Sequence, residues 1–319
     1  MIKHTLEIAE RPASVYLRNQ QLVIESGEGE DKIRRSFACE DIGVLILQHP
    51  GIFLSSAVAM ELLKNGSAIL FSDAKHLPAG LLLPTTMHSE LVPRMQAQIS
   101  ASEPTRKRMW KAVVEAKIRE QRVHLTERNA THDSLPRLLR LEQSVRSGDP
   151  ENHEAQAARI YWSACFPQQY AEGDRRLPEG TSLFNALLNY GYAIIRAAVA
   201  RALVASGLQP ALGVFHSRRD NPFCLADDLM EPLRPLVDRV VAKILENESN
   251  SSERLERRHR QPLLQLLASE VSIHSFRGPL MVALSRYTSG FQKCLVDKDA
   301  PFDYPKLLSC TSADINACG

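Results

Sequence analysis

One stretch in the second half of the chain, residues 215–235, combines side chains that a metal-dependent phosphodiester site needs. His216 lies on a polar loop rich in arginine, and an apolar helix bearing carboxylates is expected to begin about ten residues later. On that helix Asp228 and Glu231 are three residues apart, so their side chains point the same way. An imidazole and two carboxylates can ligate a divalent metal ion, and arginines can hold phosphates. The stretch therefore indicates phosphodiester chemistry.

A further carboxylate, Glu154, is expected on the inward face of another helix. The pair Asp149-Pro150 favours a helix start, and the helix should run through Trp162. Small or apolar residues follow Glu154 at positions i+3, i+4, i+7 and i+11, which places it on the apolar stripe. A carboxylate there needs a cation or a hydrogen-bond donor. The alternative is that Glu154 only complements the dipole of the first helical turn.

Each of these residues also has a purely structural interpretation. A single histidine such as His216 is more often structural than catalytic, and Asp227 with Asp228 can be an acidic cluster at a helix N-terminus. Residues 153–157 begin like an HExxH motif, but Ala157 stands where the second histidine belongs, which argues against a zinc protease. The functional interpretation is favoured because the histidine and the carboxylates coincide with an arginine-rich loop.

Two groups of basic residues are candidates for binding DNA. One group follows His216, and the other belongs to residues 106–123, which are expected to form a basic helix. Trp110 in the second group favours a nucleic-acid surface, because aromatic rings stack on bases; the alternative is an ordinary solvated helix face. The candidate DNA-binding residues are Arg218, Arg219, Arg106, Lys107, Arg108 and Lys111.

The composition sets broad limits. A chain of 319 residues suggests roughly two domains, and 44% hydrophobic with 24% charged residues is ordinary for a globular protein. The net charge of +2 arises from 39 basic and 37 acidic residues, so any nucleic-acid surface must be a local patch. The six cysteines form no CxxC pair, which indicates a reducing cytoplasm. The N-terminus has no apolar signal segment, and residues 183–206, which include Arg196, are expected to be a buried helix rather than a membrane span.

The expected elements change character near residue 85. Before it, short β-type runs suggest a small antiparallel β domain, with a tight turn at Asn19-Gln20 and one helix at 55–66. The predicted strands are 14–18, 21–25, 43–48 and 68–73. After residue 90 the pattern is helical almost throughout. The predicted helices are 106–123, 150–165, 182–206 and one from about 225 that Pro232 and Pro235 should kink.

Five motifs in order carry a resemblance to a known family. They are EDIGVLIL (41–48), ILFSDAKHLPAGLLLP (69–84), ENHEAQAARIYW (151–162), LFNALLNYGYAIIRAAVARAL (183–203) and FHSRRDNPFCLADDLMEPLRP (215–235). The chain resembles the CRISPR-associated spacer-acquisition integrases, CRISPR-associated protein one, and most closely their type II branch. The resemblance covers roughly residues 1–300.

The resemblance implies an α+β fold in two domains. A small β-sandwich-like N-terminal domain, residues 1–86, would mediate a homodimer. A larger all-α C-terminal domain, residues 87–303, would be catalytic, and a tail at 304–319 is expected to be disordered. Dimerisation through the β domain is also expected because its short strands bury little surface and leave edges to cover.

The resemblance also implies the reaction and its partners. Glu154, His216 and Glu231 would be catalytic and would ligate Mg²⁺ or Mn²⁺. Some branches of the family use two acidic residues on the last helix, which would make Asp228 a fourth ligand. The free 3′-OH of a DNA fragment would attack a phosphodiester at the edge of a CRISPR repeat, and the 3′-OH of the repeat would leave. The partners would be DNA and a small ferredoxin-like companion protein, with no membrane involved. The three ligands should then converge on one point.

Two other functions fit the same residues. The first is a stand-alone metal-dependent nuclease acting on branched DNA, which an assay separating strand joining from cutting would distinguish. The second is a non-catalytic DNA-binding scaffold, which would show no Mn²⁺-dependent activity.

Overall fold

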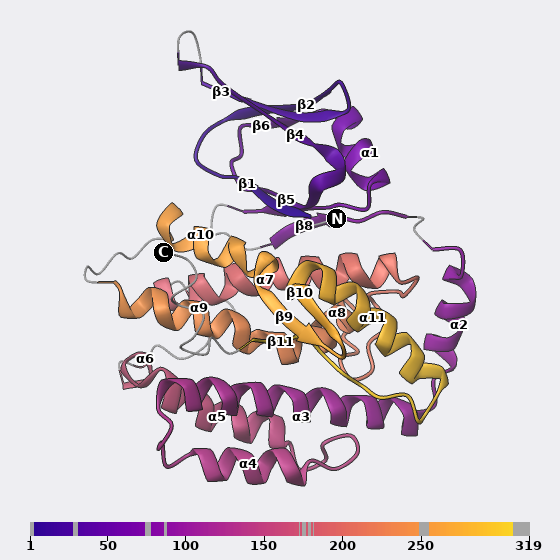
Figure 1. Ribbon diagram of the computed structural model, residues 1–319, viewed down its shortest axis with the longest axis vertical. Coiled ribbons are helices and arrows are strands. Elements are labelled where there is room, and N and C mark those ends of the chain that lie inside the picture. The colour runs from indigo at the N-terminus through magenta and orange to yellow at the C-terminus, as the bar shows by residue number, and fades with distance from the viewer. Residues whose placement is uncertain are drawn as a thin grey trace.

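The N-terminal strands form two four-stranded sheets that face each other, above a helical part (Figure 1). The structure is a computed structural model and describes residues 3–27, 31–73, 78–85, 88–171, 173, 177, 180, 182–248 and 255–308. One sheet has the order β1 (His4–Ile8), β5 (Ile42–Leu47), β7 (Ala68–Ser72), β8 (Pro78–Leu82). The other has the order β4 (Ile33–Ala38), β3 (Gln21–Ser26), β2 (Ala13–Arg18), β6 (Ile52–Leu54).

The pairing of these strands differs from the expected antiparallel domain. Strand β5 lies parallel to β1 and β7, and β6 lies parallel to β2, so both sheets are mixed. The predicted hairpin is confirmed: Arg18 pairs with Gln21 across Asn19 and Gln20, which both have positive φ angles. Such φ angles belong to the tight turns that match strand twist. All six residues of β5 are buried, because the other sheet and a helix cover its two faces.

Helix α1 (Ser56–Lys64) packs against the sandwich, with the side chain of Ser55 capping its N-terminus. Its apolar face inserts Val58 and Leu62 into the core between the sheets. The sequence predicted this helix because its start has a serine cap and its end is followed by Gly66, which adopts a φ of 73°.

The larger part of the chain is helical, as predicted, and the α+β class is confirmed (Figure 1). Its helices are α2 (Leu91–Ser100), α3 (Glu103–Arg128), α4 (Leu135–Ser144), α5 (His153–Cys165), α6 (Pro167–Ala171), α7 (Leu183–Ala205), α8 (Cys224–Met230), α9 (Arg234–Glu246), α10 (Arg257–Gln265) and α11 (Leu280–Val296). The helical part also has the short 3₁₀ helices η3 (Glu231–Leu233) and η4 (Leu266–Ala268), and η2 (Cys39–Asp41) lies between β4 and β5 in the sandwich. The kink expected from Pro232 is confirmed, because η3 separates α8 from α9.

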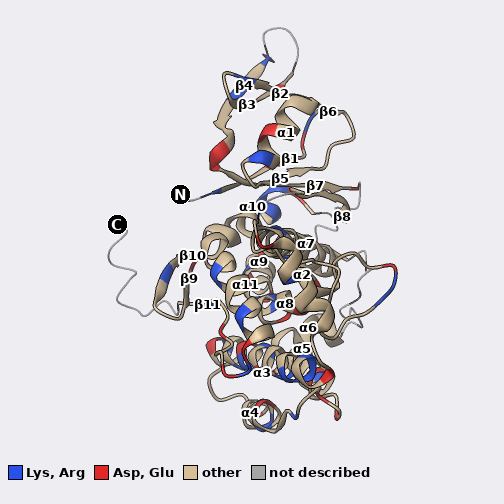
Figure 2. Cartoon of the chain, turned by 90° about the vertical axis from the view of Figure 1, so that its right-hand side faces the viewer, with Lys and Arg blue, Asp and Glu red and all other residues tan. Residues whose placement is uncertain are grey.

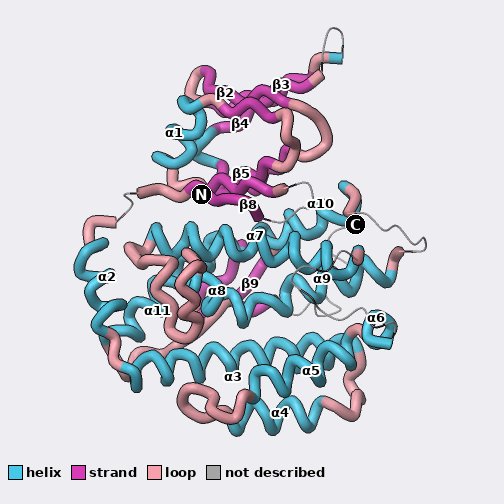
Figure 3. The backbone as a smooth tube through the Cα atoms, turned by 180° about the vertical axis from the view of Figure 1, so that it is seen from behind, coloured by secondary structure: helices cyan, strands magenta, loops and turns pink. Residues whose placement is uncertain are grey.

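The helical part is not all helical, which corrects the sequence analysis. It also contains a three-stranded sheet of β10 (Phe276–Pro279), β9 (Glu270–Ile273) and β11 (Lys306–Leu307), seen behind α8 and α9 in Figure 3. Strand β11 and the buried Tyr304 belong to the segment expected to be a disordered tail. They are ordered because β11 pairs with β9 and the Tyr304 hydroxyl donates to Glu120. The rest of that expectation, residues 309–319, lies outside the described residues.

Helix α7 lies at the centre of the molecule, against the sheet on one side and α9 and α11 on the other. Among the described helices it is the one that is long and apolar enough to cross a membrane, yet 83% of its apolar window is buried inside the protein. The Arg201 guanidinium donates to the carbonyl of Gly66 at 2.5 Å, which ties α7 to the β part. The helix therefore serves as a core helix here, as the sequence predicted.

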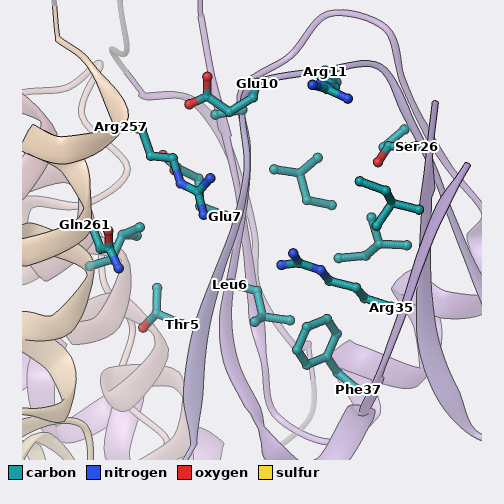
Figure 4. Close-up of a pocket in the computed structure, with 16 residues that line it drawn as sticks. Thr5, Leu6, Glu7, Glu10, Arg11, Ser26, Arg35, Phe37, Arg257 and Gln261 are labelled. Atoms are coloured by element: carbon teal, nitrogen blue, oxygen red, sulfur yellow. The ribbon is translucent and has the colours of Figure 1, made fainter. Parts of the chain in front are cut away.

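The sandwich and the helical part are also joined by polar contacts at β1. Glu7 accepts from the Tyr190 hydroxyl at 2.6 Å and from Arg260 at 2.9 Å. Nearby, a cavity of about 340 Å³ opens between the edge strands β1 and β4 and helix α10, with Arg35 and Phe37 on its sandwich side (Figure 4). Its lining shares no residue with the candidate site described next, so we assign it no part in that site.

Candidate active site

Glu154 and Glu231 meet at a third residue that the sequence analysis missed. The ammonium of Lys117 lies 2.6 Å from Glu154 Oε1 and 2.5 Å from Glu231 Oε2. Only 11% of the Lys117 side chain is exposed, against 23% for Glu154 and 6% for Glu231. Two carboxylates 77 positions apart in the sequence thus share one largely buried cation. The expectation that Glu154 faces inward to a cation is confirmed.

Glu154 is held by the unusual start of α5. The predicted helix start at Asp149-Pro150 is wrong by three residues, because Asn152 is the N-cap and accepts from Ala155. The Asp149 carboxylate instead reaches over the turn and accepts from the backbone N–H groups of His153 and Glu154, at 2.8 and 3.0 Å. Two acceptors therefore satisfy the free N–H groups of the first turn and fix the place of Glu154.

Glu231 is buried on η3, where the chain changes from α8 to α9. Its second oxygen accepts from Arg234 Nε at 2.9 Å. Burial raises the pKa of this carboxyl, but the charges of Arg234 and Lys117 more than compensate and bring the pKa to about 2. Glu231 is therefore ionised at any physiological pH. Its Oε2 lies 2.5 Å from the Lys117 ammonium, so each oxygen of this buried carboxylate faces a cation.

Arg234 links the carboxylates to a buried polar network behind them. Its guanidinium lies over the Tyr192 ring, 4.5 Å from the centroid, and the Tyr192 hydroxyl donates to Asp238 at 2.5 Å. Asp238 also accepts from Tyr161. Burial raises the pKa of Asp238 to about 6, although the two tyrosine hydrogen bonds lower it. This network supports Arg234, and through it Glu231, from the side away from solvent.

His216 is fixed by Asp228, which is fully buried. One oxygen of Asp228 accepts from the backbone N–H and from Nδ1 of His216, at 3.1 and 2.6 Å. The other accepts from the backbone N–H groups of Val214 and Phe215. The hydrogen bond to Asp228 raises the pKa of His216; burial opposes this, and the charges of Asp228 and Glu231 add to it. Because Nδ1 is engaged, Nε2 is the nitrogen left for a ligand.

The tight loop around Asp228 depends on Gly213. A Cβ at this position would lie 2.3 Å from the backbone oxygen of His216 and 2.9 Å from Asp228 Oδ2. Any side chain there would push the loop away from the carboxylate that organises it. The spacing of Asp228 and Glu231 predicted a shared site, but the structure gives the two residues different roles. Asp228 orients His216, and Glu231 contacts Lys117.

Trp110 is not on the surface, which corrects its expected contact with nucleic acid. It is 1% exposed and stacks beneath Phe215, with ring centroids 4.1 Å apart and planes 2° apart. Its edge also meets the His216 ring at 5.9 Å. Trp110 therefore supports the loop that carries the histidine. Phe215, which the sequence analysis did not single out, is the exposed aromatic residue at this place, with 50% of its surface exposed.

The basic candidates fall into different environments. Arg218 is 76% exposed and pairs with Asp220, and Arg219 is exposed beside it. On α3, Lys107 and Lys111 pair with glutamates one turn away, Arg108 donates to the carbonyl of Cys294, and Arg106 is half-buried. Figure 2 shows basic and acidic residues interspersed over α3, α4 and α5. The exposed loop therefore offers phosphate ligands more readily than α3 does.

A groove of about 700 Å³ runs beside His216. Arg196, Arg218 and Arg234 line it together with Asp220 and other residues. Arg196 is fixed there, because it pairs with Asp227 at 2.8 Å and donates to Asn221. The pair of acidic residues 227 and 228 is thus more than a helix N-terminal cluster: each holds a different part of the loop.

The described residues contain no group of three His, Cys, Asp or Glu side chains already arranged around a metal position. The donor chemistry nevertheless fits a divalent cation. Two carboxylates face one positive charge, and Nε2 of His216 is the nitrogen that Asp228 does not engage. The charge of Glu231 acts on this histidine and helps to raise its pKa. The Lys117 ammonium lies between the two carboxylates, where the cation would bind. Asp228 does not fit as a ligand, because four donors already occupy its oxygens.

Comparison with known proteins gives a consistent assignment. The family described as CRISPR associated protein Cas1 matches residues 6–276. A CRISPR-associated endonuclease Cas1 from Neisseria meningitidis serogroup C (strain 8013) is 35% identical over 283 residues, which cover 89% of each chain. A second one from Saccharolobus solfataricus is 30% identical over 248 residues, covering 76% of this chain and 75% of its own.

Solved structures show the same fold at low sequence identity. A casposase bound to integration product aligns over 98% of both chains with a TM-score of 0.80 and 20% identity. A Cas1 protein from Thermotoga maritima aligns over 93% of this chain and 98% of its own, with a TM-score of 0.75 and 15% identity. A chain of a Cas6-RT-Cas1–Cas2 complex covers 96% of this chain and 36% of its own, with a TM-score of 0.76 and 19% identity.

Proposed function

This chain belongs to the Cas1 family of CRISPR-associated endonucleases, and on that premise we propose that it is a metal-dependent DNA integrase. Its reaction would insert DNA fragments as new spacers into a CRISPR array by attack of a 3′-OH on a phosphodiester. The type II branch, indicated by the sequence motifs, is part of the same proposal. So is a cytoplasmic location, which the cysteine usage indicates.

Three residues would hold the cation: Glu154, Glu231 and Nε2 of His216. When bound, Mg²⁺ or Mn²⁺ supplies positive charge that orients the reacting phosphate and stabilises the attacking and leaving oxygens. The protein's own part is to place the ligands. Asp228 fixes the histidine ring, Arg234 keeps Glu231 ionised, and the groove beside His216 offers arginines to the phosphates of a DNA strand.

One observation supports this proposal most strongly. Two acidic residues that lie 77 positions apart, on α5 and η3, face one buried positive charge, although burying ionised carboxylates is costly. The two carboxylates are balanced by two cations, because Glu231 also pairs with Arg234. A doubly charged ion that displaced the Lys117 ammonium would meet both carboxylates, and Asp228 already orients His216 for a third bond.

The partners follow from the reaction. Joining both ends of one fragment needs two active sites, which a homodimer supplies. We propose that the dimer forms through the sandwich, residues 1–86, and that residues 87–303 carry the catalysis. A small ferredoxin-like companion protein would bridge the two sites; the similar chain from the Cas6-RT-Cas1–Cas2 complex supports such a partner. DNA would bind through Arg218 and Arg219, with weaker contributions from the basic residues of α3.

The test is Glu231→Gln, which keeps the size of the side chain and removes its charge. A short duplex with free 3′-OH ends should no longer join a repeat-containing plasmid, while affinity for DNA stays nearly unchanged, because affinity comes mostly from contacts to phosphates. Glu246→Gln, which makes the same change at the exposed end of α9 where Glu246 pairs with Arg128, is the matched control and should retain joining. Joining at the wild-type rate in Mn²⁺ by the Glu231→Gln protein would contradict the proposal.

The same assay separates the two alternative functions. A stand-alone nuclease would cut branched DNA in Mn²⁺ without producing joined strands. A scaffold would bind the DNA but neither cut nor join it in any divalent metal.

A further inference from the structure

Phe215 is an exposed aromatic ring at the edge of the candidate active site. Half of its surface is exposed, and it directly precedes His216 in the sequence. Single exposed apolar side chains are common on protein surfaces, so exposure alone assigns no role. The surroundings of this ring are what distinguish it from the others.

The ring is held rigidly from one side. Trp110, which is buried, stacks against it with planes 2° apart and centroids 4.1 Å apart. The His216 ring meets its edge at 5.5 Å and 86°. Its backbone N–H donates to the buried Asp228. One face of Phe215 is therefore covered and its plane is fixed by three neighbours, so the exposed half of the ring is a flat, preorganised surface.

A flat apolar surface of this kind suits one class of ligand in a DNA-joining enzyme. An unpaired nucleobase has two aromatic faces, and its stacking on a protein aromatic ring contributes about 1–3 kcal/mol. Exposed arginines 218 and 219 follow on the same loop and can take the phosphates of that nucleotide. A paired base inside a duplex has no free face to offer, because its neighbours in the duplex cover both.

We propose that Phe215 is a stacking platform for the unpaired nucleobase at the reacting 3′ end of the DNA fragment. The base continues the stack that Trp110 and Phe215 begin, and this places its sugar beside His216. The proposal rests on the proposed function, since it assigns to Phe215 the positioning of the reacting 3′ end.

The experiment measures binding without catalysis. The probe is a duplex whose short 3′ overhangs carry 2-aminopurine at the terminal position, in buffer containing EDTA. Stacking quenches the fluorescence of 2-aminopurine. The wild-type protein and Phe215→Tyr should quench it, whereas Phe215→Leu, which keeps apolar bulk but removes the flat ring, should not. Phe215→Leu should also bind overhang DNA about 5- to 150-fold more weakly, which corresponds to one lost stacking contact.

The control is Val296→Ala, which changes an apolar residue at the end of α11 that is 65% exposed and lies outside the sandwich. It should quench and bind as the wild type does. All four proteins should bind a blunt duplex equally. Equal loss of blunt-duplex binding in Phe215→Leu would overturn the proposal, because the ring would then only support the loop. The proposal would also be overturned if Phe215→Leu still quenched the probe but changed its self-association in light scattering. That result would assign Phe215 to a protein interface.

The outcome is independent of the metal-site proposal. Glu231→Gln should quench the probe as the wild type does, because stacking needs no metal. If Glu231→Gln still joins DNA while Phe215→Leu loses quenching, the proposed metal site fails and the platform stands.

Discussion

Replacement of Lys117 by methionine tests the arrangement of the site in the absence of metal. Methionine keeps most of the apolar stem and removes the charge, which leaves Glu154 and Glu231 facing each other. Removing one partner from a buried ion pair costs about 3–5 kcal/mol of unfolding free energy. The cost here should be lower, about 2–3 kcal/mol, because Glu231 keeps Arg234 at 2.9 Å and Glu154 is 23% exposed.

The same variant should bind a divalent cation more tightly. In the wild type, a cation must displace the ammonium from between the carboxylates, whereas in Lys117→Met it meets no competing charge. A tenfold gain in Mn²⁺ affinity would add about 1.4 kcal/mol of stabilisation at saturating metal. Part of the stability lost in EDTA should therefore return when Mn²⁺ is added.

The assay is urea unfolding followed by circular dichroism, in EDTA and then in Mn²⁺. Lys111→Met is the control, since Lys111 lies on the same helix, is 40% exposed and pairs with Glu115 at 3.6 Å. Its loss should change the unfolding free energy by less than about 0.5 kcal/mol. Equal stability of the wild type and Lys117→Met in EDTA, with the same response to Mn²⁺, would refute the reasoning.

Three further changes follow from the loop and the buried network. Asp228→Asn should leave a buried donor unsatisfied at a cost of about 1–3 kcal/mol, and the pKa of His216 measured by NMR should fall; an unchanged pKa would contradict the assigned hydrogen bond. Gly213→Ala should abolish joining while the far-UV spectrum stays native, because its Cβ would meet the loop backbone; full activity would argue that the loop adapts. Burial lowers the pKa of His124 to about 3, so below pH 6.5 the unfolded chain binds a proton that the folded chain does not, and stability should fall by up to about 1.4 kcal/mol per pH unit. His124→Asn should therefore lose less unfolding free energy than the wild type between pH 7 and pH 5, as measured by urea unfolding.

The sequence predicted the elements that have strong local signals. The Asn19-Gln20 hairpin, helix α1 and helix α7 were all found, because turn residues, caps and periodic apolar residues define them locally. Strand β4, IRRSFA, was missed because its exposed, arginine-bearing sequence lacks the alternation of a half-buried strand. The parallel pairing of β1 with β5 is set by contacts between segments far apart in the chain, which no local pattern records.

The candidate site was predictable in its residue types but not in its centre. Glu154, His216 and Glu231 stood out because carboxylates and histidine on apolar segments are unusual. Lys117 looked like one more charge in a basic helix, and only packing shows that it faces inward. A signal did exist: Lys117, Glu120 and His124 recur at helical spacing on the stripe that Trp110 and Val113 begin. A polar continuation of an apolar stripe indicates a buried polar site.

The central claim is that Glu154, Glu231 and His216 hold a catalytic metal ion where Lys117 now supplies the positive charge. Anomalous diffraction from crystals soaked in Mn²⁺ tests it most directly. We predict one strong peak within about 2.0–2.6 Å of both carboxylates and of His216 Nε2, with the Lys117 ammonium displaced. A crystal of active protein in which Lys117 still joins the two carboxylates, with Mn²⁺ bound elsewhere, would contradict the account.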